Sequence, residues 1–94
     1  MINVALLGFG RIGQMHAQNI YLNKTLNLLY VYEKIDKLRK KAKSLYNCKI
    51  EKNYKKIFSD KKVDIIFISS PQILISDLSK RASNTIKLFF VKNP

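Results

Sequence analysis

The sequence predicts an α/β fold with a parallel sheet of about five strands in the order 3-2-1-4-5, and three observations lead to it. Short apolar runs alternate along the chain with stretches whose apolar residues recur at helical spacing. A glycine-rich turn directly follows the first apolar run. The run at Val63–Ser69 is almost wholly apolar, as expected of a strand covered on both faces. Strands that alternate with helices form right-handed crossovers, which make neighbouring strands parallel.

The first half of the chain predicts two strands and two helices. An apolar run gives a strand at Ile2–Leu7, and apolar residues on one side at helical spacing give a helix from about Arg11 to Asn23. A second apolar run predicts a strand at Leu26–Tyr32. Asn47 suits the left-handed position that ends a helix. The amphipathic helix before it has lysines outside and an apolar side made by Ile35, Leu38, Ala42 and Leu45.

The second half predicts three further strands. Cys48–Glu51 gives a short strand, and Asn53 can cap a helix of one or two turns after it. The buried strand at Val63–Ser69 comes next, followed by a helix to about Ser83 and a last strand at Lys87–Val91. No linker or internal repeat divides the 94 residues, so we expect one domain.

The turn after the first strand reads Gly8-Phe9-Gly10-Arg11-Ile12-Gly13, a G-x-G-x-x-G pattern between a strand and a helix. In that context one glycine makes a tight turn, one lets the backbone approach a pyrophosphate, and one lets helix and strand pack closely. The diphosphate would rest on free N–H groups at the positive end of the helix. The turn predicts a dinucleotide site, and the alternative is a glycine turn with no ligand.

An acidic residue, Glu33, ends the second apolar run, 20 positions after Gly13. Its carboxylate can accept hydrogen bonds from an adenosine ribose hydroxyl and would repel a 2′-phosphate, so the sequence favours NAD over NADP. Lys34 could tolerate a 2′-phosphate, which leaves NADP open. Arg11 can neutralise the diphosphate or face the solvent.

The chain carries a formal net charge of +12, from 18 Lys and Arg against 6 Asp and Glu. A basic surface attracts phosphate. However, only three of these cations are arginine, the residue suited to bidentate phosphate recognition. We therefore expect a solvated basic surface rather than a nucleic-acid interface, with polyanion binding as the alternative.

The remaining composition bears on compartment and metal. No apolar segment is long enough to cross a membrane, and the first residues lack a secretory signal. Cys48 is the only cysteine, so we expect no internal disulfide, a cytoplasmic location and a small core residue rather than a nucleophile. No histidine, cysteine or carboxylate cluster has metal-ligand spacing, so we expect no metal.

The chain resembles the N-terminal domain of the glucose-fructose oxidoreductase / inositol dehydrogenase / MocA family over essentially its whole length. The resemblance rests on the run Val4–Gly13, on His16 three residues later, on Glu33 where the family usually has Asp, and on the Ser69-Ser70-Pro71 that follows the fourth strand. The hexapeptide Gly-Phe-Gly-Arg-Ile-Gly also resembles glyceraldehyde-3-phosphate dehydrogenase, but that family lacks the histidine and the Ser-Ser-Pro.

The resemblance implies a Rossmann-type fold and hydride transfer between a nicotinamide and a sugar or cyclitol carbon, as in inositol 2-dehydrogenase. It implies that the backbone from Phe9 to Ile12 contacts the pyrophosphate and that Glu33 contacts the adenosine ribose. It places Ser69 and Ser70 near the nicotinamide ribose. For the helix residue His16 we expect a hydrogen bond beneath the sheet, and the alternative is a contact to the cofactor or substrate.

The resemblance also implies a catalytic lysine in a Glu-Lys-Pro turn and a C-terminal substrate domain. Here the turn reads Lys92-Asn93-Pro94, and Asn93 cannot carry the titrating proton that general acid/base catalysis needs. A one-residue slip would make Lys92 the lysine. We therefore predict an NAD(P)-binding domain over residues 1–94, truncated before the substrate domain, with no catalytic residue and inactive alone.

Two further interpretations stay open. The chain can be a non-catalytic assembly module that self-associates, because no helix is expected to cover Phe89 and Phe90 on the last strand. It can also be an eroding gene remnant without a selected function.

Overall fold

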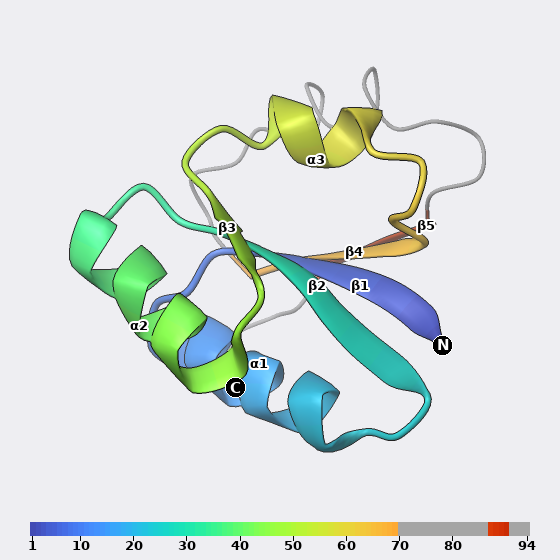
Figure 1. The fold of residues 1–94 in the computed structure, drawn as a ribbon, viewed down its shortest axis with the longest axis horizontal. Coiled ribbons are helices and arrows are strands. Elements are labelled where there is room, and N and C mark those ends of the chain that lie inside the picture. The colour runs from blue at the N-terminus through green and yellow to red at the C-terminus, as the bar shows by residue number, and fades with distance from the viewer. Residues whose placement is uncertain (70–86, 91–94) are drawn as a thin grey trace.

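The protein folds as one parallel sheet with helices on both faces (Figure 1). A computed structural model describes residues 1–69 and the backbone of residues 87–90. Its strands lie in the order β3-β2-β1-β4-β5, so the predicted fold class and strand order are confirmed. The bounds are β1 (Ile2–Leu7), β2 (Leu26–Tyr32), β3 (Lys49–Glu51), β4 (Ile65–Ile68) and β5 (Lys87–Phe90).

Three helices belong to the described residues: α1 (Arg11–Leu22), α2 (Asp36–Tyr46) and α3 (Lys55–Ser59). Helices α1 and α2 cover one face of the sheet, and α3 covers the other (Figure 1). Asn47 has φ 51° and ends α2 in the left-handed region, as predicted. The helix expected up to about Ser83 lies outside the described residues, as does Ser70.

Strand β1 lies in the middle of the sheet, and its second half is buried on both faces. Its last four residues, Val4 to Leu7, are all 0 % exposed. Ala5 and Leu7 join the core on the α3 side, whereas Val4 and Leu6 join the core on the α1 and α2 side. This burial fixes the end of β1, where the glycine turn begins.

Strands β3 and β4 are both shorter than predicted, and β4 ends at Ile68 rather than Ser69. Strand β4 begins at Ile65 rather than Val63, although Val63 is buried and the backbone N–H of Asp64 already donates to the Asn3 carbonyl at 2.9 Å. Strand β3 begins at Lys49, and Cys48 packs in the core with its thiol 3.8 Å from the Ala42 carbonyl oxygen. Both residues are core positions, as their apolar character indicated.

The α3 face also carries a partly buried polar contact. The Tyr30 hydroxyl donates to Asp60 Oδ2 at 2.5 Å. Burial, together with the Asp60 carboxylate, raises the pKa of Tyr30 to about 12. The same hydrogen bond lowers the pKa of Asp60. This pair ties β2 to the end of α3.

Candidate functional site

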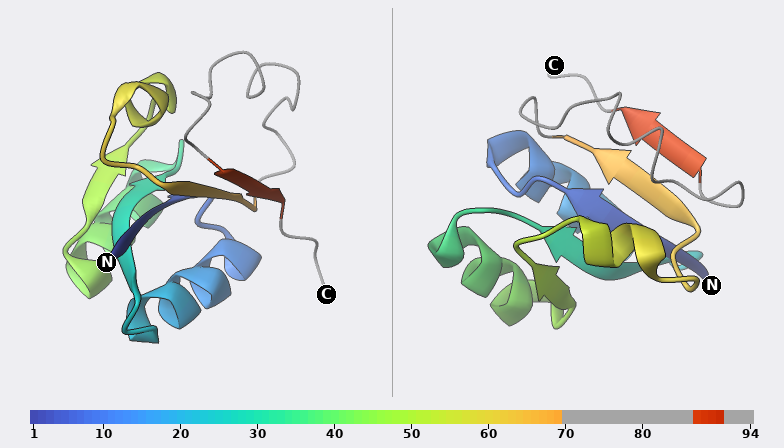
Figure 2. Two further views of the ribbon diagram at one scale, coloured as in Figure 1. Left: turned by 90° about the vertical axis from the view of Figure 1, so that its right-hand side faces the viewer. Right: turned by 90° about the horizontal axis from the view of Figure 1, so that it is seen from above.

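The candidate site lies where the carboxyl ends of β1, β2 and β4 meet. The glycine turn follows β1, Glu33 follows β2 and Ser69 follows β4, and Figure 2 shows these strands side by side. Strand β1 has β2 on one side and β4 on the other, so the chain reverses its direction of progress across the sheet here. In open α/β sheets such a switch point is where ligands bind.

Two glycines of the turn are required by its geometry. Gly8 has φ 110°, a conformation that side-chain-bearing residues rarely adopt, and its N–H donates to the Tyr32 carbonyl at 2.8 Å. A Cβ on Gly13 would lie 2.1 Å from the Gly8 carbonyl oxygen. Helix α1 therefore begins in direct contact with the turn, and both steric roles expected of these glycines are present.

Gly10 differs, because nothing lies within 4 Å of the position that its Cβ would take. Its φ of −74° and ψ of −165° are accessible to any residue. No packing or backbone requirement in the described structure explains a glycine here. The open space in front of Gly10 fits a group that approaches the backbone closely.

The start of α1 is open to an anion. The helix begins at Arg11, no side chain caps it, and no acidic residue lies in its first turn. The first N–H groups of a helix have no acceptor within the helix, and they form its positive end. Arg11 is exposed and forms no ion pair with any carboxylate among residues 1–69. These features suit a diphosphate.

Glu33 reaches from the end of β2 to the glycine turn. Its Oε1 accepts a hydrogen bond from the Phe9 N–H at 2.9 Å, and its Oε2 accepts one from the Ile35 N–H at 3.0 Å. The structure thus brings Glu33 and the turn together, as the sequence predicted. It also directs the Phe9 N–H to Glu33, whereas the family resemblance implied a pyrophosphate contact from Phe9.

Ser69 supports the turn from the β4 side. Its hydroxyl lies 3.0 Å from the Gly8 carbonyl oxygen and 3.2 Å from that of Leu7, and it donates its proton to this pair. Its N–H donates to the Leu7 carbonyl at 2.9 Å. A Cβ on Gly13 would lie 3.0 Å from the Ser69 Oγ, so Ser69, Gly8 and Gly13 form one tightly packed group.

Two residues that sequence reasoning missed also hold the site. Gln14 Nε2 donates to the Phe9 carbonyl at 3.2 Å, and Gln14 Oε1 accepts from Lys41 Nζ at 2.8 Å. Arg39 bonds the turn between β2 and α2. Its spacing of three from Asp36 is a recognisable ion-pair signal on a helix, but that signal does not reveal the contacts to the turn.

His16 was expected to form a hydrogen bond beneath the sheet. Its Nε2 is buried, and it has no hydrogen-bond partner in the described structure. For this atom the expectation is wrong.

Two titrating groups among the described residues, Tyr32 and Cys48, have raised pKa values. Burial, and then the charge of Glu33, raises the pKa of Tyr32. Burial also raises the pKa of the Cys48 thiol, which keeps it protonated and unsuited to nucleophilic attack. Among residues 1–69 and 87–90, no group of three or more His, Cys, Asp or Glu could hold a metal ion. None of the described helices is long and apolar enough to cross a membrane.

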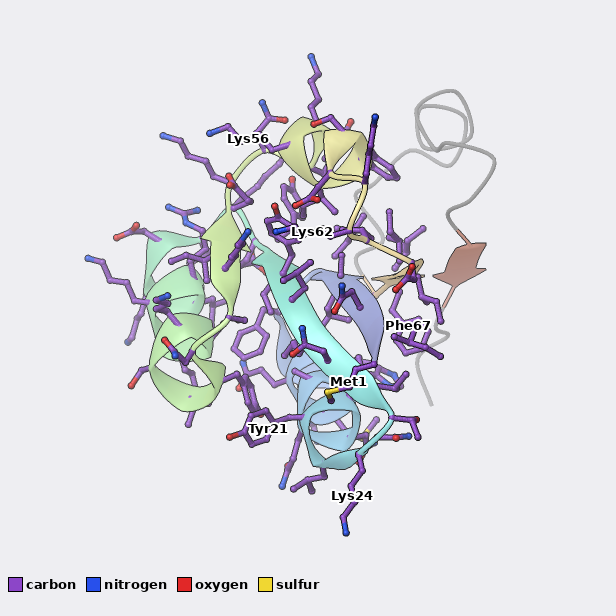
Figure 3. All side chains as sticks on the ribbon, turned by 45° about the vertical axis from the view of Figure 1, so that its right-hand side comes forward. Met1, Tyr21, Lys24, Lys56, Lys62 and Phe67 are labelled. Atoms are coloured by element: carbon purple, nitrogen blue, oxygen red, sulfur yellow. The ribbon has the colours of Figure 1, made fainter. Side chains whose placement is uncertain are left out.

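The basic charge is spread over the surface. In Figure 3, Lys56 lies by α3 and Lys24 lies beyond the end of α1, at the opposite end of the molecule. Both ion pairs found in the described residues use Asp36, so most lysines have no carboxylate partner there. A hollow of about 320 Å³ beside Tyr21, Leu22 and Tyr46 lies at the amino end of the sheet, away from the glycine turn.

Comparison with known proteins agrees with this geometry. The model of the GFO_IDH_MocA family, described as an oxidoreductase family with an NAD-binding Rossmann fold, matches residues 2–92. The uncharacterized oxidoreductase YrbE of Bacillus subtilis is 28% identical over 94 residues, which are 99% of this chain. The chain spans 28% of the length of that relative.

Solved structures give the same result. A myo-inositol dehydrogenase of Corynebacterium glutamicum is 27% identical with a TM-score of 0.84, over 96% of this chain and 27% of that one. The fold of scyllo-inositol dehydrogenase from Lactobacillus casei, determined with NAD(H) and scyllo-inositol, matches with a TM-score of 0.83 at 22% identity, over 96% of this chain and 27% of that one. Because the family model covers nearly every residue, the chain belongs to the glucose-fructose oxidoreductase / inositol dehydrogenase / MocA family and carries its NAD-binding Rossmann fold.

Proposed function

We propose that the chain binds NAD at the glycine turn, as the nucleotide-binding part of a dehydrogenase that acts on a sugar or cyclitol. The observation that carries this proposal is the open space in front of Gly10, next to an uncapped helix start. The backbone conformation at Gly8 and the close packing at Gly13 each require a glycine. A glycine at position 10 is required only if a ligand approaches its backbone.

In this proposal each residue of the turn has a distinct task. The N–H groups from Gly10 to Ile12 receive the diphosphate at the positive end of α1, and Arg11 adds a neutralising charge. Glu33 accepts hydrogen bonds from the adenosine ribose. Ser69 keeps the Gly8 carbonyl in place. We assign Ser69 and Ser70 to the nicotinamide ribose from the family resemblance. The bound nicotinamide supplies hydride transfer, and these residues bind and orient it.

The proposal includes a preference for NAD over NADP. Both carboxylate oxygens of Glu33 are held by backbone N–H groups, so its negative charge stays beside the glycine turn. A 2′-phosphate in that position would face this charge. Lys34 is exposed and could offset part of the repulsion, so we expect NADPH to bind more weakly than NADH and not to be excluded.

The names of the matching structures point to an inositol as the class of substrate. We propose that this chain alone does not oxidise one. At the position of the family's catalytic lysine the sequence has Asn93, and an amide cannot exchange the proton that hydroxyl oxidation releases. Residues 91–94 lie outside the described part of the chain, so this step rests on the sequence alone.

Calorimetric titration with NADH and NADPH tests cofactor binding. We expect heat of binding with NADH and a weaker response with NADPH. Glu33→Gln should weaken NADH binding and narrow the difference between the cofactors, because it removes the charge and replaces one of the two acceptor oxygens with an NH₂ group. Lys34→Met, a change of charge one residue away, should lower the affinity for NADPH only.

The absence of any binding heat with millimolar NADH would refute the proposed site. Activity is tested separately by following NAD reduction at 340 nm with myo-inositol and the purified chain. We expect none. Measurable turnover would refute the proposal that the chain is inactive alone, and it would point to Lys92 as the proton-transferring residue.

A further inference from the structure

The guanidinium of Arg39 forms hydrogen bonds with the turn between β2 and α2. Its Nη1 donates to the carbonyl oxygens of Glu33 at 2.7 Å and of Lys34 at 2.8 Å, and its Nη2 donates to Asp36 Oδ1 at 2.9 Å. Three of its five N–H donors are thereby used on one turn. Only 14 % of the side chain is exposed, against 74 % for its neighbour Lys40.

The requirements of α2 do not explain this position. Helix α2 begins at Asp36, so the guanidinium of Arg39 lies at the amino-terminal end of the helix. A cation at that end opposes the helix dipole. Lys40 already pairs with the other oxygen of Asp36 at 3.1 Å. Arg39 differs from Lys40 because it also donates to the carbonyls of Glu33 and Lys34 in the preceding turn.

The carboxylate of Glu33 also forms hydrogen bonds with this turn and with the glycine turn. The Glu33 carboxylate accepts hydrogen bonds from the Phe9 N–H and the Ile35 N–H, while the Glu33 carbonyl accepts one from Arg39. The backbone of Glu33 is thus fixed on one side by a guanidinium and its side chain on the other by two N–H groups. A loss of the Arg39 contacts releases the carbonyls that orient residue 33.

We propose that Arg39 is a positioning residue that keeps the Glu33 carboxylate against the glycine turn and so sets the preference for NAD. This inference rests on the proposed function, because Glu33 is taken to bind the adenosine ribose. Arg39 does not itself receive a 2′-phosphate. Both hydrogens of its Nη1 are used on carbonyls, so the Nη1 and Nη2 pair is not free to bind a phosphate in a bidentate manner.

The experiment compares Arg39→Met with Lys40→Met. Both variants remove one positive charge from the same helix and one partner from Asp36, but only the first loses contacts to the turn. Hydrogen exchange at the Phe9 and Ile35 amides reports on the Glu33 carboxylate without any cofactor. Dissociation constants for NADH and NADPH report on selectivity.

In Arg39→Met we expect faster exchange at both amides, with unchanged exchange in the centre of β1. The affinity for NADH should fall about tenfold. We take this magnitude by analogy from metal sites, where loss of a residue that orients a ligand weakens binding by a similar factor. The affinity for NADPH should fall less, so the ratio of the two affinities falls. Lys40→Met should change none of these values, and Arg39→Lys should recover part of the loss.

Unchanged exchange at the Phe9 and Ile35 amides in Arg39→Met would overturn the inference. A selective loss of NADPH binding would overturn it too, because Arg39 would then be a phosphate ligand. If the unaltered chain binds neither cofactor, the proposed function fails, and the exchange comparison still decides whether Arg39 holds Glu33.

Discussion

Gly10 and Gly13 lie three residues apart in the same turn, and a methyl group added at each would meet opposite surroundings. At Gly13 it would overlap the Gly8 carbonyl, 2.1 Å away, and touch Ser69. At Gly10 it would enter open space. The sequence pattern treats the two glycines alike, but packing within the described structure explains only Gly13.

The difference separates what holds the turn from what the turn binds. Around Gly13 the close neighbours are the backbone of Gly8 and the hydroxyl of Ser69, so this group connects the ends of β1 and β4 with α1. Around Gly10 nothing lies within 4 Å of the position of a Cβ, and no side chain caps the first N–H groups of α1, which have no acceptor within the helix. Stability and affinity should therefore respond to different substitutions within six residues of sequence.

The largest expected effect is that of Gly13→Ala on stability. The added Cβ cannot be accommodated unless α1 moves away from Gly8, so we expect a loss of about 3 kcal/mol, the upper end for a forced backbone shift. In a domain of this size that lowers the Tm by roughly 10–20 °C. Gly10→Ala is the matched control and should stay within about 1 kcal/mol of the unaltered chain. Equal losses in both variants would remove the distinction.

The next effect is that of Gly10→Val on affinity. A valine is compatible with the extended backbone at this position, so the fold should persist, but its side chain occupies the space that the diphosphate needs. We expect the dissociation constant for NADH to rise at least about tenfold, equivalent to 1.4 kcal/mol. Calorimetric titration beside a thermal melt measures both quantities. Unchanged NADH affinity would mean that the ligand lies elsewhere.

A smaller effect is expected from Ser69→Ala. The substitution removes the hydroxyl that donates to the carbonyls of Gly8 and Leu7, and we expect a loss of about 1 kcal/mol. Ser59→Ala is the control, because its hydroxyl donates within α3 to the Lys56 carbonyl at an exposed site. Chemical denaturation of both variants gives the comparison. A loss at Ser59 as large as that at Ser69 would show that the turn gains nothing specific from Ser69.

Much of the fold follows from local patterns that the sequence displays openly. The alternation of apolar runs and helical periodicity predicts the parallel sheet and its strand order, and Asn47 marks the end of α2. The exact start of β4 does not follow, because Val63 is as apolar as the strand and only pairing geometry excludes it. Likewise, the residues around Val4 and Ala5 do not predict the register shift between β1 and β2 at this point.

The site follows from the sequence only in part. The motif predicts the meeting of Glu33 with the glycine turn, because their positions are fixed by the ends of two adjacent strands. It does not predict the contacts of Arg39 or Gln14, because these depend on the path of a long side chain and not on its position on a helix. Nor does the motif predict that the Nε2 of His16 is buried without a hydrogen-bond partner in the described structure.

The smallest expected effect is the pH dependence of stability that arises from the Tyr30–Asp60 hydrogen bond on the α3 face. The packing of the glycine turn involves no such titrating pair. The hydrogen bond from Tyr30, followed by that from the Lys62 backbone N–H, lowers the pKa of Asp60 below its ordinary value of 3.8. A carboxyl group whose pKa is lower in the folded state stabilises the fold above its unfolded pKa, and this contribution is lost as the pH falls through the folded value. Acidification below about pH 4 should therefore destabilise the unaltered chain more steeply than Tyr30→Phe.

The difference between these two proteins should be less than about 1 kcal/mol, because Asp60 is partly exposed to solvent. Denaturant titrations at pH 7, 5, 4 and 3 measure it, with Gly10→Ala as a variant whose altered position carries no titrating group. Parallel pH profiles for the unaltered chain and Tyr30→Phe would mean that the Tyr30 contact does not act through the Asp60 charge. Converging profiles would show that the α3 face depends on a titrating pair, whereas the Gly13 end of the turn depends on the close contact of backbone atoms.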